Sequence, residues 1–236
     1  MTGNYFKQYL DSFRKFKLEL VIFNFLFIMF AYLGFYLMQF IVKGPMARLD
    51  EVENIAANIF GVEAAIAAFR NFFLVGAIAI LVFFLLIILS YSLFEGLIWC
   101  RILKKKFTLE YFRRFTLLNL IWFFSFIIIA SILLFGSKQS IVGVVLAVLA
   151  VVFILFSQIL GVVFTQKNKL RAIKKTFSIG FRVHRFIIPL IFILATFLIV
   201  SQLNLLNIHF ILIMIIYLVF FSWMQNYFAD VIVTIS

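Results

Sequence analysis

Residues 101–115 read RILKKKFTLEYFRRF and hold six Lys or Arg residues between two long apolar stretches. Similar basic segments occupy residues 7–17 and 167–185, and each of the three precedes a pair of apolar stretches. The other connections hold few cations. Because Lys and Arg are enriched in the cytoplasmic connections of membrane proteins, this alternation predicts a membrane fold together with its orientation.

The composition also indicates a membrane protein. The chain has 236 residues, of which 66% are hydrophobic, and its mean hydropathy is +1.20. Soluble domains are about 45–50% apolar, and a chain of this length has too little interior to bury the excess. The apolar runs are continuous, which favours helices over a β-barrel. We therefore predict an all-α fold: a polytopic transmembrane bundle that forms one integral membrane domain over residues 1–236.

The apolar runs are long enough to cross a bilayer, because about 20 residues at 1.5 Å each match a hydrocarbon core of roughly 30 Å. Gly44-Pro45 is predicted to end the first span, and Pro189 is predicted to kink the fifth, which is short. The six predicted spans are Leu18–Val42, Asn71–Leu93, Phe115–Phe135, Ser140–Phe164, Phe186–Gln202 and Ile208–Asp230.

The distribution of cations orients these spans. Seventeen of the 21 Lys and Arg residues fall on the side of the basic segments, and the other four are Lys43, Arg48, Arg70 and Lys138. The positive-inside rule therefore predicts cytoplasmic termini, which agrees with an even number of spans. We expect a multi-pass protein of a prokaryotic cytoplasmic membrane. Topology accounts for the net charge of +12, and no nucleic-acid-binding motif accompanies it, so no nucleic-acid partner is expected.

The connection between residues 43 and 70 differs from the others, because it carries four of the nine acidic residues. Its apolar residues recur at helical spacing. We predict an amphipathic helix here that caps the bundle. The alternative is an element that binds a partner or gates a pathway.

The basic segments are related to one another in sequence. Residues alike in type align in seven of nine columns when Leu10–Leu18 is placed on Leu109–Leu117, and Phe181–Phe186 is a looser third copy. The chain is therefore predicted to contain three repeats, each a basic, aromatic leader followed by a membrane hairpin. All three copies enter from the same side, so the repeat is parallel and lacks the inverted symmetry of many transporters.

This leader-and-hairpin plan resembles that of uncharacterised prokaryotic six-span membrane proteins. It also resembles the membrane region found beside the catalytic domain of some bacterial glycerophosphodiester phosphodiesterases. The resemblance covers the whole chain as architecture and rests on Phe112-Arg113-Arg114-Phe115 and Lys174-Lys175-Thr176-Phe177. The sequence holds no such catalytic domain, so the resemblance implies no catalytic residue.

The leaders are expected to be amphipathic helices at the membrane interface, with an apolar face in the acyl boundary and cations at the headgroups. The apolar faces are Phe6, Leu10 and Phe13 in the first leader and Leu170, Ile173 and Phe177 in the third. The lipid bilayer is thus the first expected partner, through anionic headgroups on the cytoplasmic side. The alternative is that the cations only set the topology and anchor the leaders. The candidate lipid contacts are Lys104, Lys105, Lys106, Arg113, Arg114, Lys174 and Lys175.

A second candidate site is a layer of polar residues within one to two turns of the cytoplasmic ends of the spans. If they converge, they line a polar cavity open to the cytoplasm, which would suit a small oligomeric transporter. The alternative is hydrogen bonding between helices, worth about 0.6 kcal/mol per contact. The candidates are Asn24, Glu95, Asn119, Gln158, Asn226 and Asp230.

Motifs for catalysis and cofactor binding are absent from the sequence: it contains no HExxH, GxSxG or P-loop. Cys100 is the single cysteine, which excludes a site of several Cys ligands. The two histidines, His184 and His209, are predicted at opposite faces of the membrane, so they cannot bind one metal ion together. We expect no catalytic, cofactor or metal site and no cofactor. The predicted function is a non-enzymatic accessory, structural or lipid-interacting membrane component, alone, as a homo-oligomer or with a membrane-protein partner. The alternative is the transporter, and a lipid-modifying enzyme comes third.

Overall fold

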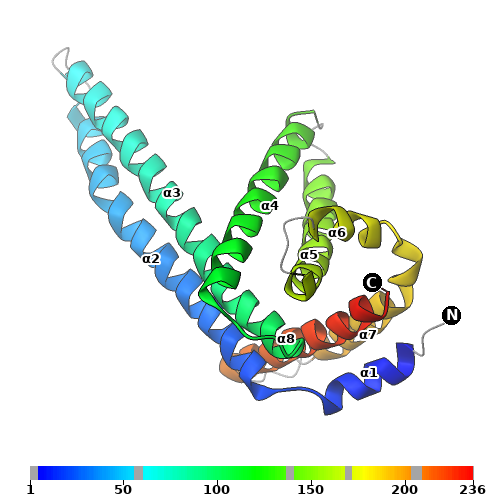
Figure 1. Cartoon of the computed structure of the whole chain (residues 1–236). Helices are drawn as coiled ribbons and strands as arrows, with labels where there is room; N and C mark the ends of the chain where they lie inside the picture. The colour runs from blue at the N-terminus through cyan, green and yellow to red at the C-terminus, as the bar shows by residue number, and fades with distance from the viewer. Residues whose placement is uncertain (1–4, 56–60, 137–140, 168–171, 203–208, 236) are drawn as a thin grey trace. The chain divides into compact units, whose positions relative to one another are not determined.

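The computed structural model describes residues 5–55, 61–136, 141–167, 172–202 and 209–235. This part of the chain folds into helices and contains no strand, so the prediction of an all-α fold is confirmed (Figure 1). The elements are α1 (Tyr5–Arg14), α2 (Leu18–Ile55), α3 (Gly61–Ile102), α4 (Leu109–Phe135), α5 (Val142–Lys167), α6 (Ala172–Gly180), the 3₁₀ helix η2 (Val183–Arg185), α7 (Ile187–Ser201) and α8 (Phe210–Ile235).

Five of these helices are long and apolar enough to cross a membrane. Three of the six predicted spans fall within them, and the predicted spans Ser140–Phe164 and Ile208–Asp230 overlap two more but begin two residues earlier. The predicted span Phe186–Gln202 instead contains α7, which has 15 residues. A helix of that length measures about 22 Å, less than the roughly 30 Å of hydrocarbon. The long candidates are Leu18–Arg48, Ala65–Ile102, Leu109–Phe135, Val142–Lys167 and Phe210–Ile235.

Proline did not act as the sequence predicted. Gly44-Pro45 does not end the first span, because α2 continues to Ile55 with Pro45 inside it. In a membrane, a broken helix leaves backbone groups without hydrogen bonds, which costs more than accommodating one proline. The predicted helix of the outer connection is thus, up to Ile55, a continuation of α2, and residues 56–60 lie outside the described part. Pro189 lies in the first turn of α7, where a missing N–H breaks no helical hydrogen bond.

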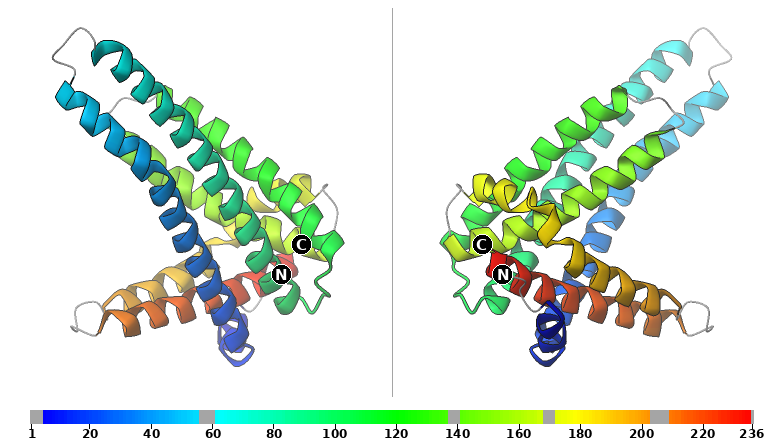
Figure 2. Two further views of the ribbon diagram at one scale, coloured as in Figure 1. Left: turned by 90° about the vertical axis from the view of Figure 1, so that its left-hand side faces the viewer. Right: turned by 90° about the vertical axis from the view of Figure 1, so that its right-hand side faces the viewer.

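The chain divides into two compact units, each described here by itself. Unit 1 comprises Met1–Phe25 and Ser92–Ser236, and unit 2 comprises Leu26–Tyr91. Unit 2 is an antiparallel pair formed by the later part of α2 and the earlier part of α3 (Figure 2). Edge-to-face ring pairs set its register, since Phe27 meets Tyr91 at 5.9 Å and Phe35 meets Phe83 at 6.2 Å between ring centres.

The core of unit 1 is built from the last turns of α3 together with α5 and α8, the second helices of the three hairpins. Each contributes a fully buried aromatic side chain, namely Trp99, Phe164 and Tyr227. Gly161 is required for this packing, because a Cβ there would overlap the indole of Trp99. Small residues allow such close approach between membrane helices.

The leaders are helical where the sequence predicted amphipathic helices, at α1 and α6. The second leader has no helix of its own, because Leu109–Arg114 forms the first turns of α4, and the third motif, Phe181–Phe186, contains η2. The helix α6 packs on α5, where a Cβ at Gly180 would lie 2.6 Å from the ring of Phe156.

Each leader packs on the second helix of a hairpin. Phe107 and Tyr111 of the second leader lie against Gly96 of α3, and α6 lies against α5. The first leader has no helix before it, and α1 packs instead on α8, the last helix of the chain. Each of the three leaders of unit 1 therefore packs on the second helix of a hairpin, and the contact of α1 with α8 brings the first and last helices of the chain together.

Candidate functional site

Two of the predicted polar residues, Asn24 of α2 and Glu95 of α3, are joined through Gln225 of α8. The amide Nδ2 of Asn24 donates to Oγ of Ser222 and to Oε1 of Gln225, each at 2.9 Å. The amide Nε2 of Gln225 donates to Oε1 of Glu95 at 2.8 Å. A continuous chain of hydrogen bonds therefore links three helices of unit 1.

Glu95 is the one ionisable residue among these hydrogen-bonded residues, and its burial is the most costly. The residue is only 8% exposed, and its second oxygen, Oε2, is buried with no hydrogen-bond partner among the described residues. A buried carboxylate without a cation is costly in a membrane. Glu95 is thus the member of this polar chain for which a bound proton or cation would matter most.

The other four candidates of the polar layer make separate contacts. Asn119 donates to Oγ of Ser92 at 2.9 Å, and Asn226 donates to the backbone oxygen of Ser12 at 3.1 Å. Asp230 forms an ion pair with Lys15 at 3.0 Å. Gln158 is half-buried, and its Oε1 has no hydrogen-bond partner within the described part of the chain. The structure therefore joins Asn24 to Glu95 and gives Asn119, Asn226 and Asp230 separate partners.

Three serines were missed at the sequence level, and they share one role. Ser92, Ser157 and Ser222 lie on α3, α5 and α8, and each Oγ accepts a hydrogen bond at 2.9 Å. The donors are the amides of Asn119 and Asn24 and the indole Nε1 of Trp122. The three serines are 65 residues apart along the chain. This period was visible in the sequence and marks the same position in each hairpin.

The helix α1 is held on α7 and α8 by polar and aromatic contacts. Nε1 of Trp223 donates to Oγ of the fully buried Ser12 at 2.7 Å. The hydroxyls of Tyr9 and Thr196 are 3.0 Å apart, and the ring of Phe13 stacks on Trp223 at 4.7 Å between ring centres. Phe6 and Leu10 stay exposed, as expected for the lipid face of an interfacial helix.

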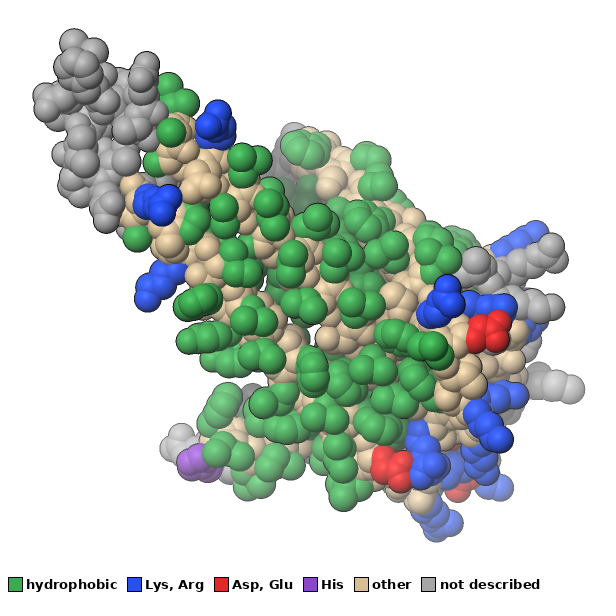
Figure 3. All heavy atoms as spheres, turned by 60° about the vertical axis from the view of Figure 1, so that its left-hand side comes forward, with side chains coloured by type: hydrophobic (Ala, Val, Ile, Leu, Met, Phe, Trp, Pro, Cys, Tyr) green, Lys and Arg blue, Asp and Glu red, His purple; other side chains and the backbone are tan. Residues whose placement is uncertain are grey.

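The predicted lipid contacts lie at the helix ends, and most are open to the surroundings. Lys104, Lys105, Lys106, Arg113 and Lys174 are exposed and form no ion pair within the described residues. Arg114 is exposed and pairs with Glu110 one turn before it, while Lys175 is half-buried. In Figure 3 many Lys and Arg side chains gather on the right of the view, and others lie at the upper left.

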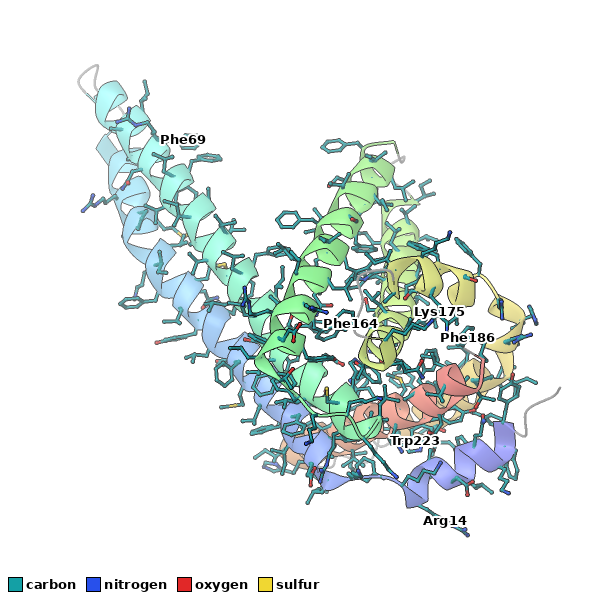
Figure 4. The ribbon with its side chains drawn as sticks, viewed as in Figure 1. Arg14, Phe69, Phe164, Lys175, Phe186 and Trp223 are labelled. Atoms are coloured by element: carbon teal, nitrogen blue, oxygen red, sulfur yellow. The ribbon has the colours of Figure 1, made fainter. Side chains whose placement is uncertain are left out.

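Lys175 is the most constrained of these cations. It projects from α6 (Figure 4), near Lys167 at the end of α5 and Arg182 just after α6. Burial lowers the pKa of the Lys175 ammonium, and the charges of Lys167 and Arg182 lower it further. An anion among these three groups would relieve the repulsion and favour the charged form. The exposed rings of Phe177 and Phe181 stack beside them at 6.0 Å.

The class of this protein follows from its own helices, because no protein-family model, no curated protein and no solved structure matches the chain. Within the described residues, His, Cys, Asp and Glu form no group of three that could hold a metal ion. The five long apolar helices define a polytopic membrane protein in contact with lipid.

Proposed function

We propose that this protein is a non-enzymatic membrane component that binds anionic lipid headgroups at its basic leaders. The observation that carries the proposal is that Lys167 and Arg182 lie near the half-buried Lys175, whose pKa is lowered first by burial and then by these two charges. Cations that only set the topology need not be brought together. A phosphate among them would offset their repulsion through charge-assisted hydrogen bonds.

The surroundings of this cluster suit a membrane interface. The helix α6 buries Ala172, Thr176 and Ile179 against α5 and leaves Lys174 and Phe177 exposed. Cations beside exposed aromatic rings are typical of helices that lie at the headgroup level. Anionic lipid is therefore the ligand favoured by both the charge and the apolar surroundings.

The proposed topology has six spans, with α7 as a short fifth one. A short apolar helix can cross where the bilayer thins or where flanking residues reach the interface. Both termini and 17 of the 21 cations then lie on the cytoplasmic side. The resemblance to the membrane region beside glycerophosphodiester phosphodiesterases agrees with an accessory role but supplies no residue for it.

Lipid binding can be measured by native mass spectrometry on the detergent-purified protein titrated with phosphatidylglycerol. Each basic residue near an anionic surface contributes about 1 kcal/mol, so Lys174→Gln with Lys175→Gln should weaken binding about thirtyfold. The matched control is Lys174→Arg with Lys175→Arg, which keeps the charge and should keep most of the affinity. Equal binding by wild type and both variants would mean that the cations only set the topology.

An accessory role also implies a membrane partner or a second copy of the chain. Purification in mild detergent after chemical cross-linking in the membrane should then yield a defined complex. A protein that stays monomeric and alone under these conditions would argue for lipid binding without assembly.

A small transporter is the second candidate. It is favoured by the buried Oε2 of Glu95, which has no hydrogen-bond partner in the described part of the chain. The test is proton flux into proteoliposomes driven by a potassium diffusion potential. A transporter that uses this carboxyl should lose flux in Glu95→Gln and keep it in Glu110→Gln, whose side chain is exposed. Absence of flux above that of empty liposomes would remove this candidate.

A further inference from the structure

The α2–α3 hairpin of unit 2 contains a groove far along the chain from the basic leaders. It has a volume of about 790 Å³ and is open on one side. Its walls are mostly apolar, with Tyr36, Phe40 and Met46 on α2 and Phe73 on α3, and among the described residues that line it Lys43 is the charged one. We propose that this groove binds one anionic phospholipid, with an acyl chain along the groove and the phosphate at Lys43.

The dimensions of the groove fit one leaflet. Its lining on α2 runs from Tyr36 to Met46, a separation of ten residues that rises about 15 Å, half of a hydrocarbon core of roughly 30 Å. An apolar groove in membrane-spanning helices is filled by acyl chains, because water there would have no partners for its hydrogen bonds. An acyl chain of one leaflet therefore matches both the length and the chemistry.

Gly76 of α3 lines the groove and leaves space there because it has no side chain. A Cβ built on Gly76 of α3 would meet no atom within 4 Å. Close packing of α2 on α3 therefore does not explain this glycine. In contrast, a Cβ built on Gly34 of α2 would lie 3.4 Å from the ring of Phe83.

The cations at one end of the groove point to an anionic headgroup. The ring pairs Phe27–Tyr91 and Phe35–Phe83 set a register that places Arg48 level with Arg70 across the hairpin. Lys43 lies five residues before Arg48, about 8 Å deeper, so its ammonium can reach the headgroup level by extending along the apolar wall. Three of the four cations outside the basic leaders, Lys43, Arg48 and Arg70, therefore lie within about 8 Å of one another along the axis of the hairpin.

Topology does not account for these three cations. The positive-inside rule explains Lys and Arg at the leaders and predicts their depletion at the other ends of the spans. In the sequence, the four acidic residues of the same connection all follow Arg48, from Asp50 to Glu63. A phosphate held by Lys43 with Arg48 and Arg70 beside it gives these cations a role.

The full-length protein in phosphatidylcholine nanodiscs can be labelled with phosphatidylglycerol that carries a photoactivatable group in its acyl chain. We expect cross-links within residues 36–46 and 72–80, and stronger competition by unlabelled phosphatidylglycerol than by added phosphatidylcholine. Lys43→Gln should weaken this labelling about fivefold. Gly76→Leu should fill the groove and reduce labelling at least as much, without a clash in the protein.

Gly143→Leu is the matched control, since a Cβ at Gly143 of α5 also meets no atom within 4 Å. It should leave labelling of residues 36–46 unchanged. Equal labelling by a phosphatidylcholine probe, with no effect of Lys43→Gln, would overturn the proposal, as would cross-links from this groove to a second copy of the chain. The site shares no residue with the basic leaders, so its failure is distinct from failure of the proposed function.

Discussion

The two parts of α3 show two ways of using similar apolar residues. In unit 1, Ile98 and Trp99 are at most 1% exposed, whereas in unit 2 Ile78 and Ile80 are about 60% exposed. The first part packs against other helices, and the second presents most of its side chains outward. Hydropathy alone does not distinguish them, because lipid is as apolar as leucine and either environment accepts the residue.

Polar and small residues make the difference between the units. Unit 1 contains the buried hydrogen bonds of Ser92, Ser157 and Ser222 and the tight contact at Gly161. In unit 2, aromatic pairs join the two helices and a groove remains beside Gly76. Unit 1 is thus the packed scaffold, and unit 2 is the part with room for lipid.

The largest expected effect is a difference in stability between two glycine-to-leucine variants, one in each unit. Gly161→Leu places a side chain where the indole of Trp99 lies, and it should destabilise unit 1 by about 3 kcal/mol or more. Gly76→Leu has open space and should change stability little. Thermal unfolding in detergent measures both, and equal losses would show that the units are packed alike.

Removal of the Ser12 hydroxyl should have the next largest effect. Ser12→Ala leaves the buried Nε1 of Trp223 without its acceptor, at an expected cost of about 2 kcal/mol. Faster cleavage of the N-terminal segment by protease should accompany the loss, because α1 is held there. Ser178→Ala, at an exposed position of α6, is the control, and an equal effect of the two would contradict the role of Ser12.

Lys104→Gly should stabilise the protein. Lys104 is in the left-handed region with φ 55°, and the backbone N–H of Lys105 donates to the oxygen of Cys100 at 2.8 Å, which is the hydrogen bond of a Schellman helix end. Glycine avoids a cost of about 1 kcal/mol at such a position. Chemical unfolding in lipid-free detergent separates this gain from the loss of a cation, and a lower stability would contradict the assigned helix end.

The smallest effect should come from each serine hydrogen bond. A double-mutant cycle of Ser92→Ala and Asn119→Leu should give a coupling of about 0.6 kcal/mol. The cycle of Ser157→Ala with Trp122→Phe should give a similar value of the same sign. A coupling of zero in both would mean that these contacts do not hold the hairpins together.

The sequence predicted the parts of the fold that depend on local pattern. The all-α class and five of the spans follow from apolar run lengths, and α1 and α6 follow from their amphipathic spacing. The extent of α2 was wrong at Pro45 because a turn signal from water-soluble proteins carries less weight where backbone groups must stay bonded.

The partners of the polar layer could not be predicted in the same way. The depth of Asn24 and Glu95 was readable from the sequence, but their link through Gln225 depends on the rotation of three helices about their axes. A one-dimensional pattern does not contain these rotations. The 65-residue period of Ser92, Ser157 and Ser222 was the one available signal for equivalent positions in the hairpins.

The central claim is that the polar layer of unit 1 is packed and excludes water, while lipid is bound at the surface. Its most direct test is the reaction of Ser222→Cys with a membrane-impermeant thiol reagent in proteoliposomes. Ser222 is fully buried, so the variant should react no more than wild type, whose single Cys100 is also buried. Ser178→Cys should react readily when the reagent is present on its side. Reaction of Ser222→Cys as fast as Ser178→Cys would show a water-filled cavity and contradict the account.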